Sequence, residues 1–163
     1  MKSRIYLEKL LPQDFESFYA LTGNEDVMAM ITERPLSKEE ALKKFNYFLE
    51  NNKLHKSFGS FKVFKVEDSG VLGFAKLEIT EENRYEAELG YMLLPEFWGR
   101  GYGNEIAEHL LEVAISDPLL KRVYANTDPD NSASRKILLK NGFTSEKVGR
   151  INGLPSEIFG REM

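Results

Sequence analysis

Cysteine is absent from this 163-residue chain, and histidine is scarce. Without cysteine, the chain has no disulfide, no thiolate nucleophile and no cysteine-ligated zinc or iron–sulfur centre. Its two histidines, His55 and His109, lie far apart in the sequence, a pattern that does not favour a histidine-rich metal site. We therefore expect a protein without a bound metal.

Long hydrophobic runs and an excess of positive charge are also missing. No segment approaches the run of about 18 apolar residues that a membrane-spanning helix needs. The first eight residues, 1–8, lack the apolar core of a secretory signal. The formal charge is −4, whereas nucleic-acid-binding domains usually carry a basic surface. These absences predict a cytoplasmic protein that binds neither membranes nor nucleic acid.

The remaining composition is that of an ordinary globular protein. Hydrophobic residues make up 42% of the chain and charged residues 29%, which excludes disorder as the dominant state. No repeat, low-complexity tract or flexible linker divides the sequence. We therefore predict a single domain over residues 1–163.

The hydrophobic pattern predicts alternating groups of strands and helices. Strands are expected over residues 3–9, 58–67, 71–80, 87–94, 122–127, 143–150 and 155–163, and helices over 12–22, 26–30, 38–51, 104–116 and 132–140. The strand 87–94 is apolar at nearly every position except Glu88, which indicates a central strand covered on both faces. The predicted fold class is α/β (α+β), with a mixed, mostly antiparallel sheet of about seven strands flanked by helices on both faces.

A glycine-rich loop lies between this central strand and the next helix. Residues 94–105 have the sequence LPEFWGRGYGNE, with glycines at Gly99, Gly101 and Gly103. Such spacing leaves room for backbone N–H groups to converge on an anion, and the helix N-terminus adds its positive end. Asn104 stands where a dinucleotide fingerprint needs glycine or alanine, and the chain has no Gly-Lys-Ser/Thr of a P-loop. By itself the loop fits either a phosphate site or a flexible surface turn.

A second motif follows at close range and favours the phosphate site. Residues 131–134 read NSAS, and residues 138–143 read LLKNGF. Together the two segments resemble the GCN5-related N-acetyltransferase (GNAT) superfamily, in which the loop corresponds to R/Q-x-x-G-x-G/A and the later stretch to N-x-x-S…L-x-K-x-G-F. The sequence of residues 98–105 is similar to that of the Rim-type branch of this superfamily, which includes ribosomal-protein N-terminal acetyltransferases.

This resemblance implies an acetyl-CoA-dependent enzyme that acetylates a primary amine by direct attack of the amine on the thioester. It also implies that the strand ending at Leu94 splays from the strand 122–127 and that pantetheine occupies the gap. A backbone N–H near Met92 or Leu93 would polarise the thioester carbonyl. The residues implied to bind acetyl-CoA are main-chain groups of Tyr91, Met92 and Leu93, the loop residues Gly99, Arg100, Gly101, Tyr102, Gly103 and Asn104, and Asn131 on the pantetheine arm.

The catalytic residues are less clearly marked, because Leu138 stands where many GNAT enzymes carry a tyrosine acid. Glu88, on the central strand, is a candidate general base if burial raises its pKa. It could equally be a carboxylate paired with a neighbouring basic side chain. Ser134 could hydrogen-bond the leaving thiolate, or it could serve only in the first turn of its helix beside Asn131.

The expected acceptor is an amine. Residues 67–88 contain seven acidic and two basic residues, whereas residues 118–140 contain five basic and two acidic ones. An acidic half suits a cationic amine, and a basic half suits an anionic cosubstrate. A site without a tyrosine acid favours an α-amine, such as a protein or peptide N-terminus, over a more basic lysine amine. Small amines remain open, as do a non-catalytic CoA-binding sensor, a nucleotide-binding protein and a homodimer.

Overall fold

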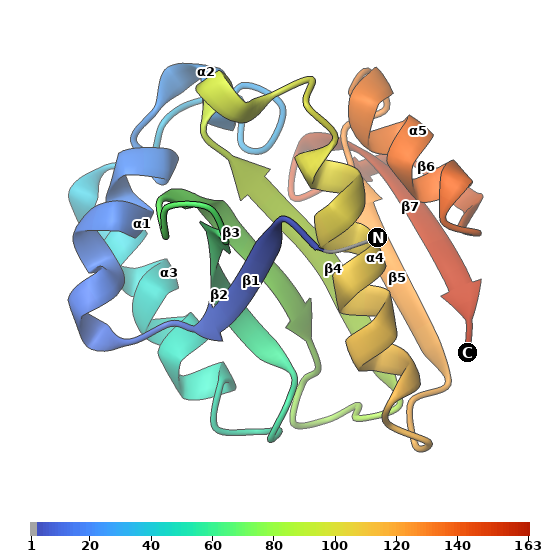
Figure 1. The fold of residues 1–163 in the computed structure, drawn as a ribbon. Coiled ribbons are helices and arrows are strands. Elements are labelled where there is room, and N and C mark those ends of the chain that lie inside the picture. The colour runs from blue at the N-terminus through green and yellow to red at the C-terminus, as the bar shows by residue number, and fades with distance from the viewer. Residues whose placement is uncertain (1–2) are drawn as a thin grey trace.

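The computed structural model describes residues 3–163, so the first two residues of the predicted domain lie outside it (Figure 1). The strands are β1 (Ile5–Lys9), β2 (Gly59–Lys65), β3 (Val71–Glu78), β4 (Glu86–Leu93), β5 (Arg122–Thr127), β6 (Thr144–Ile151) and β7 (Leu154–Glu162). The helices are α1 (Phe15–Thr22), α2 (Glu25–Met28), α3 (Lys38–Asn51), α4 (Tyr102–Ile115) and α5 (Ser132–Lys140), with 3-10 turns at Pro12–Asp14 and Pro95–Phe97. Every strand and helix predicted from the sequence is present.

The strands of residues 3–163 form one sheet in the order β1-β2-β3-β4-β5-β7-β6. All neighbouring strands are antiparallel except β4 and β5, which are parallel. The apolar strand β4 occupies the middle of the sheet, as its hydrophobic pattern predicts. The expectation of a mixed, mostly antiparallel sheet of about seven strands is confirmed.

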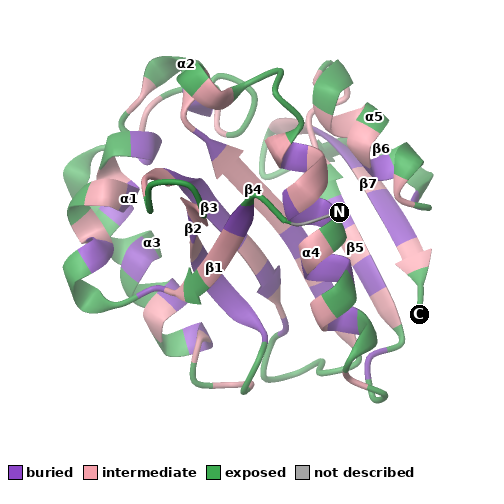
Figure 2. Cartoon of the chain, viewed as in Figure 1, coloured by how far each residue is buried: buried purple, intermediate pink, exposed green. Residues whose placement is uncertain are grey.

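Helices cover both faces of this sheet, and each face has its own apolar core. On one face α1, α2 and α3 bury an aromatic cluster that includes Phe18, Phe45 and Phe74. On the other face α4 and α5 bury aliphatic side chains such as Leu110 and Leu138. Figure 2 shows buried residues along the inner strands and in part of α4, whereas β6 is exposed throughout. No helix of the described part of the chain is long and apolar enough to cross a membrane.

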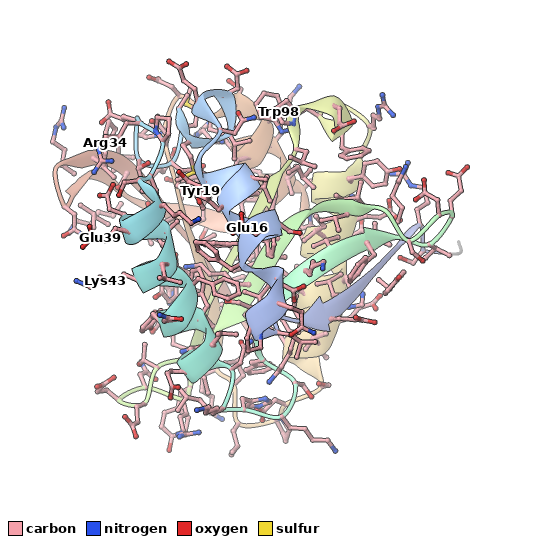
Figure 3. The ribbon with its side chains drawn as sticks, turned by 90° about the vertical axis from the view of Figure 1, so that its left-hand side faces the viewer. Glu16, Tyr19, Arg34, Glu39, Lys43 and Trp98 are labelled. Atoms are coloured by element: carbon pink, nitrogen blue, oxygen red, sulfur yellow. The ribbon has the colours of Figure 1, made fainter. Side chains whose placement is uncertain are left out.

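Helix α3 begins where the sequence predicts it. Ser37 Oγ accepts a hydrogen bond from the Glu40 N–H, and the Glu40 carboxylate accepts one from the Ser37 N–H, which forms a capping box. Arg34 also donates to both Glu40 oxygens, and these hydrogen bonds lower the pKa of Glu40 to about 2. Figure 3 shows Arg34 beside this end of α3, so the preceding loop is tied to the helix.

Helix α4 begins earlier than the sequence predicts. The predicted loop extends to Gly103, whereas the helix starts at Tyr102. Gly101, with a φ of 85°, is the N-cap, and this left-handed conformation turns the chain directly into the helix. Gly103 lies in the first turn, where a Cβ would be 3.0 Å from Ile137 Cδ1 and 3.1 Å from the Tyr91 hydroxyl. Glycine at 103 therefore serves close packing of α4 against β4 and α5.

Candidate active site

The parallel strands β4 and β5 pair over a short distance and then separate. Within residues 3–163 their register joins Glu86 to Arg122, Ala87 to Val123 and Glu88 to Tyr124, and no later pair follows. Strand β4 nevertheless continues to Leu93 and β5 to Thr127. A gap between strands therefore opens in the middle of the sheet, and Glu88 and Tyr124 form its closed end.

Peptide groups of β4 line this gap. The Leu94 N–H donates to the Leu72 carbonyl of β3, so the alternation of the antiparallel ladder turns the peptide groups of Leu89, Tyr91 and Leu93 toward β5. Met92 differs from the expectation that its main chain binds pantetheine. Its carbonyl oxygen lies against Gly73 of β3, because even-numbered residues of β4 pair with that strand. Main-chain groups of Tyr91 and Leu93, but not of Met92, are therefore available to a ligand in the gap.

The glycine loop begins at the open end of the gap. The Trp98 indole N–H donates to the Leu93 carbonyl over 2.9 Å, which fastens the start of the loop to β4. Gly99 and Gly101 both adopt positive φ angles, 71° and 85°, that side chains rarely tolerate. The loop then leads into the N-terminus of α4, whose first N–H groups have no partner within the helix. This arrangement can bind an anionic phosphate.

Arg4, near the N-terminal end of β1, braces the loop, and no local pattern in the sequence indicates this role. Its guanidinium donates to the Arg100 carbonyl over 2.9 Å and to Glu105 over 2.7 Å. It also lies 4.2 Å from the centre of the Tyr102 ring, in a cation–π contact. These contacts join residues about a hundred positions apart, so they depend on the complete fold.

The side chains of the remaining loop residues differ in whether protein contacts already occupy them. Asn104 accepts a hydrogen bond from Asn141 and donates one to Glu108, each over 2.9 Å, so its side chain joins α4 to α5. Tyr102 is occupied by Arg4. Arg100 is exposed, and its side chain forms no ion pair among the described residues. Of these three side chains, Arg100 is the one most accessible to a phosphate.

Asn131 and Ser134 lie together at the N-terminal end of α5. Asn131 is the N-cap, and its Oδ1 accepts a hydrogen bond from the Ser134 N–H over 3.1 Å. The Ser134 side chain lies near the Tyr91 phenol; burial of the phenol raises the pKa of Tyr91, and Ser134 lowers it by a smaller amount. Ser134 thus has the capping environment foreseen as an alternative, and its side chain also lies near a side chain of β4. Leu138, one turn later, is buried in the core and contributes no polar group.

Glu88, at the closed end of the gap, has a basic partner. Its carboxylate is 3.2 Å from Lys76 of β3, and about a quarter of each side chain is exposed. The general-base hypothesis from the sequence requires Glu88 to be enclosed in an apolar layer, and Glu88 is not enclosed in one. The pairing with a neighbouring basic side chain, the other alternative from the sequence, is present. A paired carboxylate next to a gap can still accept a proton from an incoming ammonium group.

Tyr124 of β5 is directly opposite Glu88 and was not singled out from the sequence. Burial, together with the nearby carboxylates Glu88, Glu86 and Glu78, raises the pKa of Tyr124 to about 12. The phenol is therefore neutral at physiological pH and can donate a hydrogen bond. The parallel register of β4 and β5 places Tyr124 opposite Glu88, but the sequence alone does not specify which residues of the two strands pair.

Two basic residues expected to attract an anion are already neutralised. Arg122 donates to both oxygens of Glu146, and Arg135 donates to both oxygens of Glu157. The side-chain contribution to phosphate binding is therefore smaller than the sequence charge suggests, and the peptide groups of the loop contribute more. In residues 3–163 no group of three or more acidic or histidine side chains could hold a metal ion.

The match to known proteins agrees with this geometry. The model of the acetyltransferase (GNAT) domain family matches residues 4–144. The uncharacterized N-acetyltransferase YoaA of Bacillus subtilis (strain 168) is 31% identical over 150 residues, which cover 90% of this chain and 83% of that protein.

Solved structures share the same fold. Spermidine N-acetyltransferase from Vibrio cholerae, in complex with CoA and spermine, superposes with a TM-score of 0.80 at 20% identity, over 99% of this chain and 96% of that one. RimL, a ribosomal L7/L12 alpha-N-protein acetyltransferase in complex with CoA, gives a TM-score of 0.80 at 17% identity, over 99% of this chain and 96% of that one.

The chain therefore belongs to the GNAT family of acetyltransferases. It is an acetyl-CoA-dependent N-acetyltransferase, and acetyl-CoA is its cosubstrate. The gap lined by free peptide groups, followed by a glycine loop at a helix N-terminus, has the chemistry to fit a pantetheine arm and its pyrophosphate.

Proposed function

We propose that this protein acetylates the α-amine of a protein or peptide N-terminus, with small primary amines as a second class of acceptor. The observation that carries the proposal is the closed end of the β4–β5 gap, where Glu88 and Tyr124 lie side by side. A carboxylate and a neutral phenol at this point can receive an ammonium group, remove its proton and orient the free amine. The similarity of residues 98–105 to the Rim-type branch also supports an N-terminal acceptor.

The reaction is a direct transfer. The amine nitrogen attacks the thioester carbonyl carbon, a C–N bond forms, the C–S bond to CoA breaks, and the second proton that the nitrogen loses goes to the departing thiolate. Glu88 takes the proton that the ammonium must lose, and a peptide N–H of β4 polarises the carbonyl. The Ser134 hydroxyl, at the N-terminal end of α5, hydrogen-bonds the departing thiolate. No covalent enzyme intermediate is needed, which agrees with the absence of cysteine.

The absence of a phenol at Leu138 favours an α-amine. At pH 7.4 an amine with a pKa near 7.8 is neutral in about a quarter of molecules, whereas a lysine amine near 10.4 is neutral in about one in a thousand. A site with a modest base therefore acts more readily on the α-amine. This argument ranks acceptors by the proton that must be removed.

Two measurements test the proposal. Acetyl-CoA at about 100 times its dissociation constant should stabilise the folded protein by about 2.7 kcal/mol, while ATP and NADH should not. Released CoA thiol is then followed with a thiol reagent during incubation with peptides, lysine derivatives and polyamines. Because the chain has no cysteine, the enzyme adds no thiol background.

Turnover highest with peptide α-amines supports the proposal. Stabilisation by acetyl-CoA without thiol release for any amine would instead identify a non-catalytic CoA sensor. Turnover with lysine or polyamine amines but not α-amines would contradict the assigned acceptor.

A further inference from the structure

The face of the sheet opposite α4 and α5 carries a cluster of charged side chains at the closed end of the gap. Glu78, Glu88 and Tyr124 are cross-strand neighbours on β3, β4 and β5. Their alternation along the strands places them on the same face. Helix α3 covers this face, and Tyr47 from that helix donates to Glu78 Oε1 over 3.2 Å. An amine that reaches the closed end of the gap from this side meets this cluster first.

The negative charge of the cluster is only partly neutralised. Lys76 pairs with Glu88 at 3.2 Å. The second oxygen of Glu78, Oε2, is buried and has no hydrogen-bond partner among the described residues. A buried carboxylate oxygen without a donor is unfavourable. An ammonium group placed beside Glu88 would therefore lower the energy of both carboxylates.

One positive charge in the cluster is also unmatched. Lys44 of α3 forms no ion pair in the described part of the chain, although its ammonium is close enough to Lys76, Glu88 and Glu78 to interact with their charges. The residue as a whole is exposed, but its ammonium is partly desolvated by the surrounding protein. This desolvation, with a smaller effect of Lys76, lowers the pKa of Lys44. An anion beside Lys44 would relieve this unfavourable environment.

The two unmatched groups have opposite signs and do not reach each other. A ligand that carries one ammonium and one carboxylate, a few bonds apart, would satisfy both at once. A polyamine would satisfy the carboxylates but would bring further positive charge toward Lys44 and Lys76, which is unfavourable. The cluster therefore distinguishes acceptors by the charge they carry next to the reacting amine.

We infer that the acceptor of this enzyme is an α-amine with a carboxylate nearby, and that Lys44 of α3 selects for that carboxylate. The inference rests on the proposed function and narrows it. The chemistry has two sources, a free amino acid with its α-carboxylate or a peptide whose first residue is acidic. Lys44 is a specificity residue in this scheme and takes no part in the chemical step.

The test compares acceptors in pairs that differ in one negative charge, with kcat/KM expressed per neutral amine because a nearby carboxylate raises the pKa of an α-amine. One pair is a peptide amide beginning with aspartate and its isosteric counterpart beginning with asparagine, and the other is free alanine and alanine amide. Spermidine serves as the polycation. The readout is kcat/KM from thiol release, for the wild-type enzyme and for the Lys44→Met, Lys44→Arg and Lys43→Met variants. Lys43 is the matched control, because Figure 3 shows it on the same helix pointing away from the protein.

In the wild type we expect the carboxylate-bearing member of at least one pair to be preferred about tenfold, the size of a hydrogen bond to a charged group. Lys44→Met should abolish that preference, while Lys44→Arg and Lys43→Met should retain it. The pair that shows the preference identifies the source of the carboxylate.

Equal kcat/KM values within both pairs would overturn the inference and leave the proposed function standing. A preference that persists in Lys44→Met would overturn the role of Lys44, and a preference for spermidine would overturn the acceptor class. Turnover of no amine at all would overturn the proposed function, and this inference with it.

Discussion

The two faces of the central sheet differ in the atoms that build their parts of the site. On the α4–α5 side, the gap and the glycine loop present peptide N–H and C=O groups, from residues close together in the sequence. On the α1–α3 side, the cluster presents side chains from α3, β3, β4 and β5, between Lys44 and Tyr124. A backbone-built site is recognisable from a short motif, because glycine spacing is its signature. A site built from side chains requires the fold.

The largest expected effect comes from a substitution in the part of the site that is built from backbone groups. In Gly101→Val, a β-branched residue must adopt a φ of 85°, and its side chain is placed beside Arg4 at the start of α4. We expect acetyl-CoA affinity to fall at least about 100-fold, measured by calorimetry or by loss of thermal stabilisation. The matched control is Gly149→Val on the exposed strand β6, where a Cβ would meet no atom within 4 Å. Wild-type affinity in Gly101→Val would show that the loop does not bind the cosubstrate.

A smaller effect is expected on the side-chain face. Glu88→Gln retains the shape of the side chain but removes its capacity to take a proton, so we expect kcat at pH 7 to fall about 100-fold. The loss should be smaller at pH 9, because more of the acceptor amine is already neutral. Acetyl-CoA affinity should not change, which would separate the two faces functionally.

The control for this variant is Glu112→Gln, an exposed glutamate on α4. A pH profile and kcat in Glu88→Gln equal to those of the wild type would reduce Glu88 to a structural partner of Lys76.

The smallest expected effect concerns a buried carboxylate that stabilises the part of the protein next to the backbone-built site. Glu157 of β7 is buried, accepts hydrogen bonds from Arg135 of α5 and Ser145 of β6, and has a lowered pKa because of these bonds. Glu157→Gln should therefore reduce the free energy of unfolding by about 1 kcal/mol at pH 7. Since the folded-state pKa lies below the unfolded one, this stability difference is present above the ordinary glutamate pKa. It disappears as the pH falls through the lowered value.

Chemical unfolding of both proteins at pH 7 and at acidic pH measures this difference. Acetyl-CoA affinity should change by less than threefold, roughly the effect of a weakened structural contact. A larger loss of affinity with unchanged stability would mean that the ion pair itself takes part in cosubstrate binding.

The elements of the fold could be predicted from the sequence because local signals marked them clearly. Ser37 and Glu40 define the start of α3, and the apolar run of β4 places that strand at the centre of the sheet. The start of α4 was misplaced, because a glycine at a helix N-cap and a glycine in the first turn look alike in a sequence. The left-handed φ of Gly101, and the close packing at Gly103, distinguish them only in three dimensions.

The acceptor side could not be predicted to the same depth. Glu88 was recognised because a lone carboxylate interrupts an apolar strand, but its partner Lys76 depends on the register of β3 with β4. Tyr124 and Lys44 carry no local signal, since a tyrosine in a strand and a lysine on a helix are ordinary surface patterns. Their significance comes from the end of the β4–β5 ladder, which no periodicity encodes.

That short ladder is also the hydrogen-bonded seam between two half-sheets in the described part of the chain. Three residue pairs join the half-sheet β1–β4 to the half-sheet β5–β7 in residues 3–163, with α4 as the covalent connection. A ligand that bonds to both sides of the gap would act as an added strand across this seam and would stabilise the folded state. Resistance of the enzyme to proteolysis would then rise and fall with the supply of its own cosubstrate.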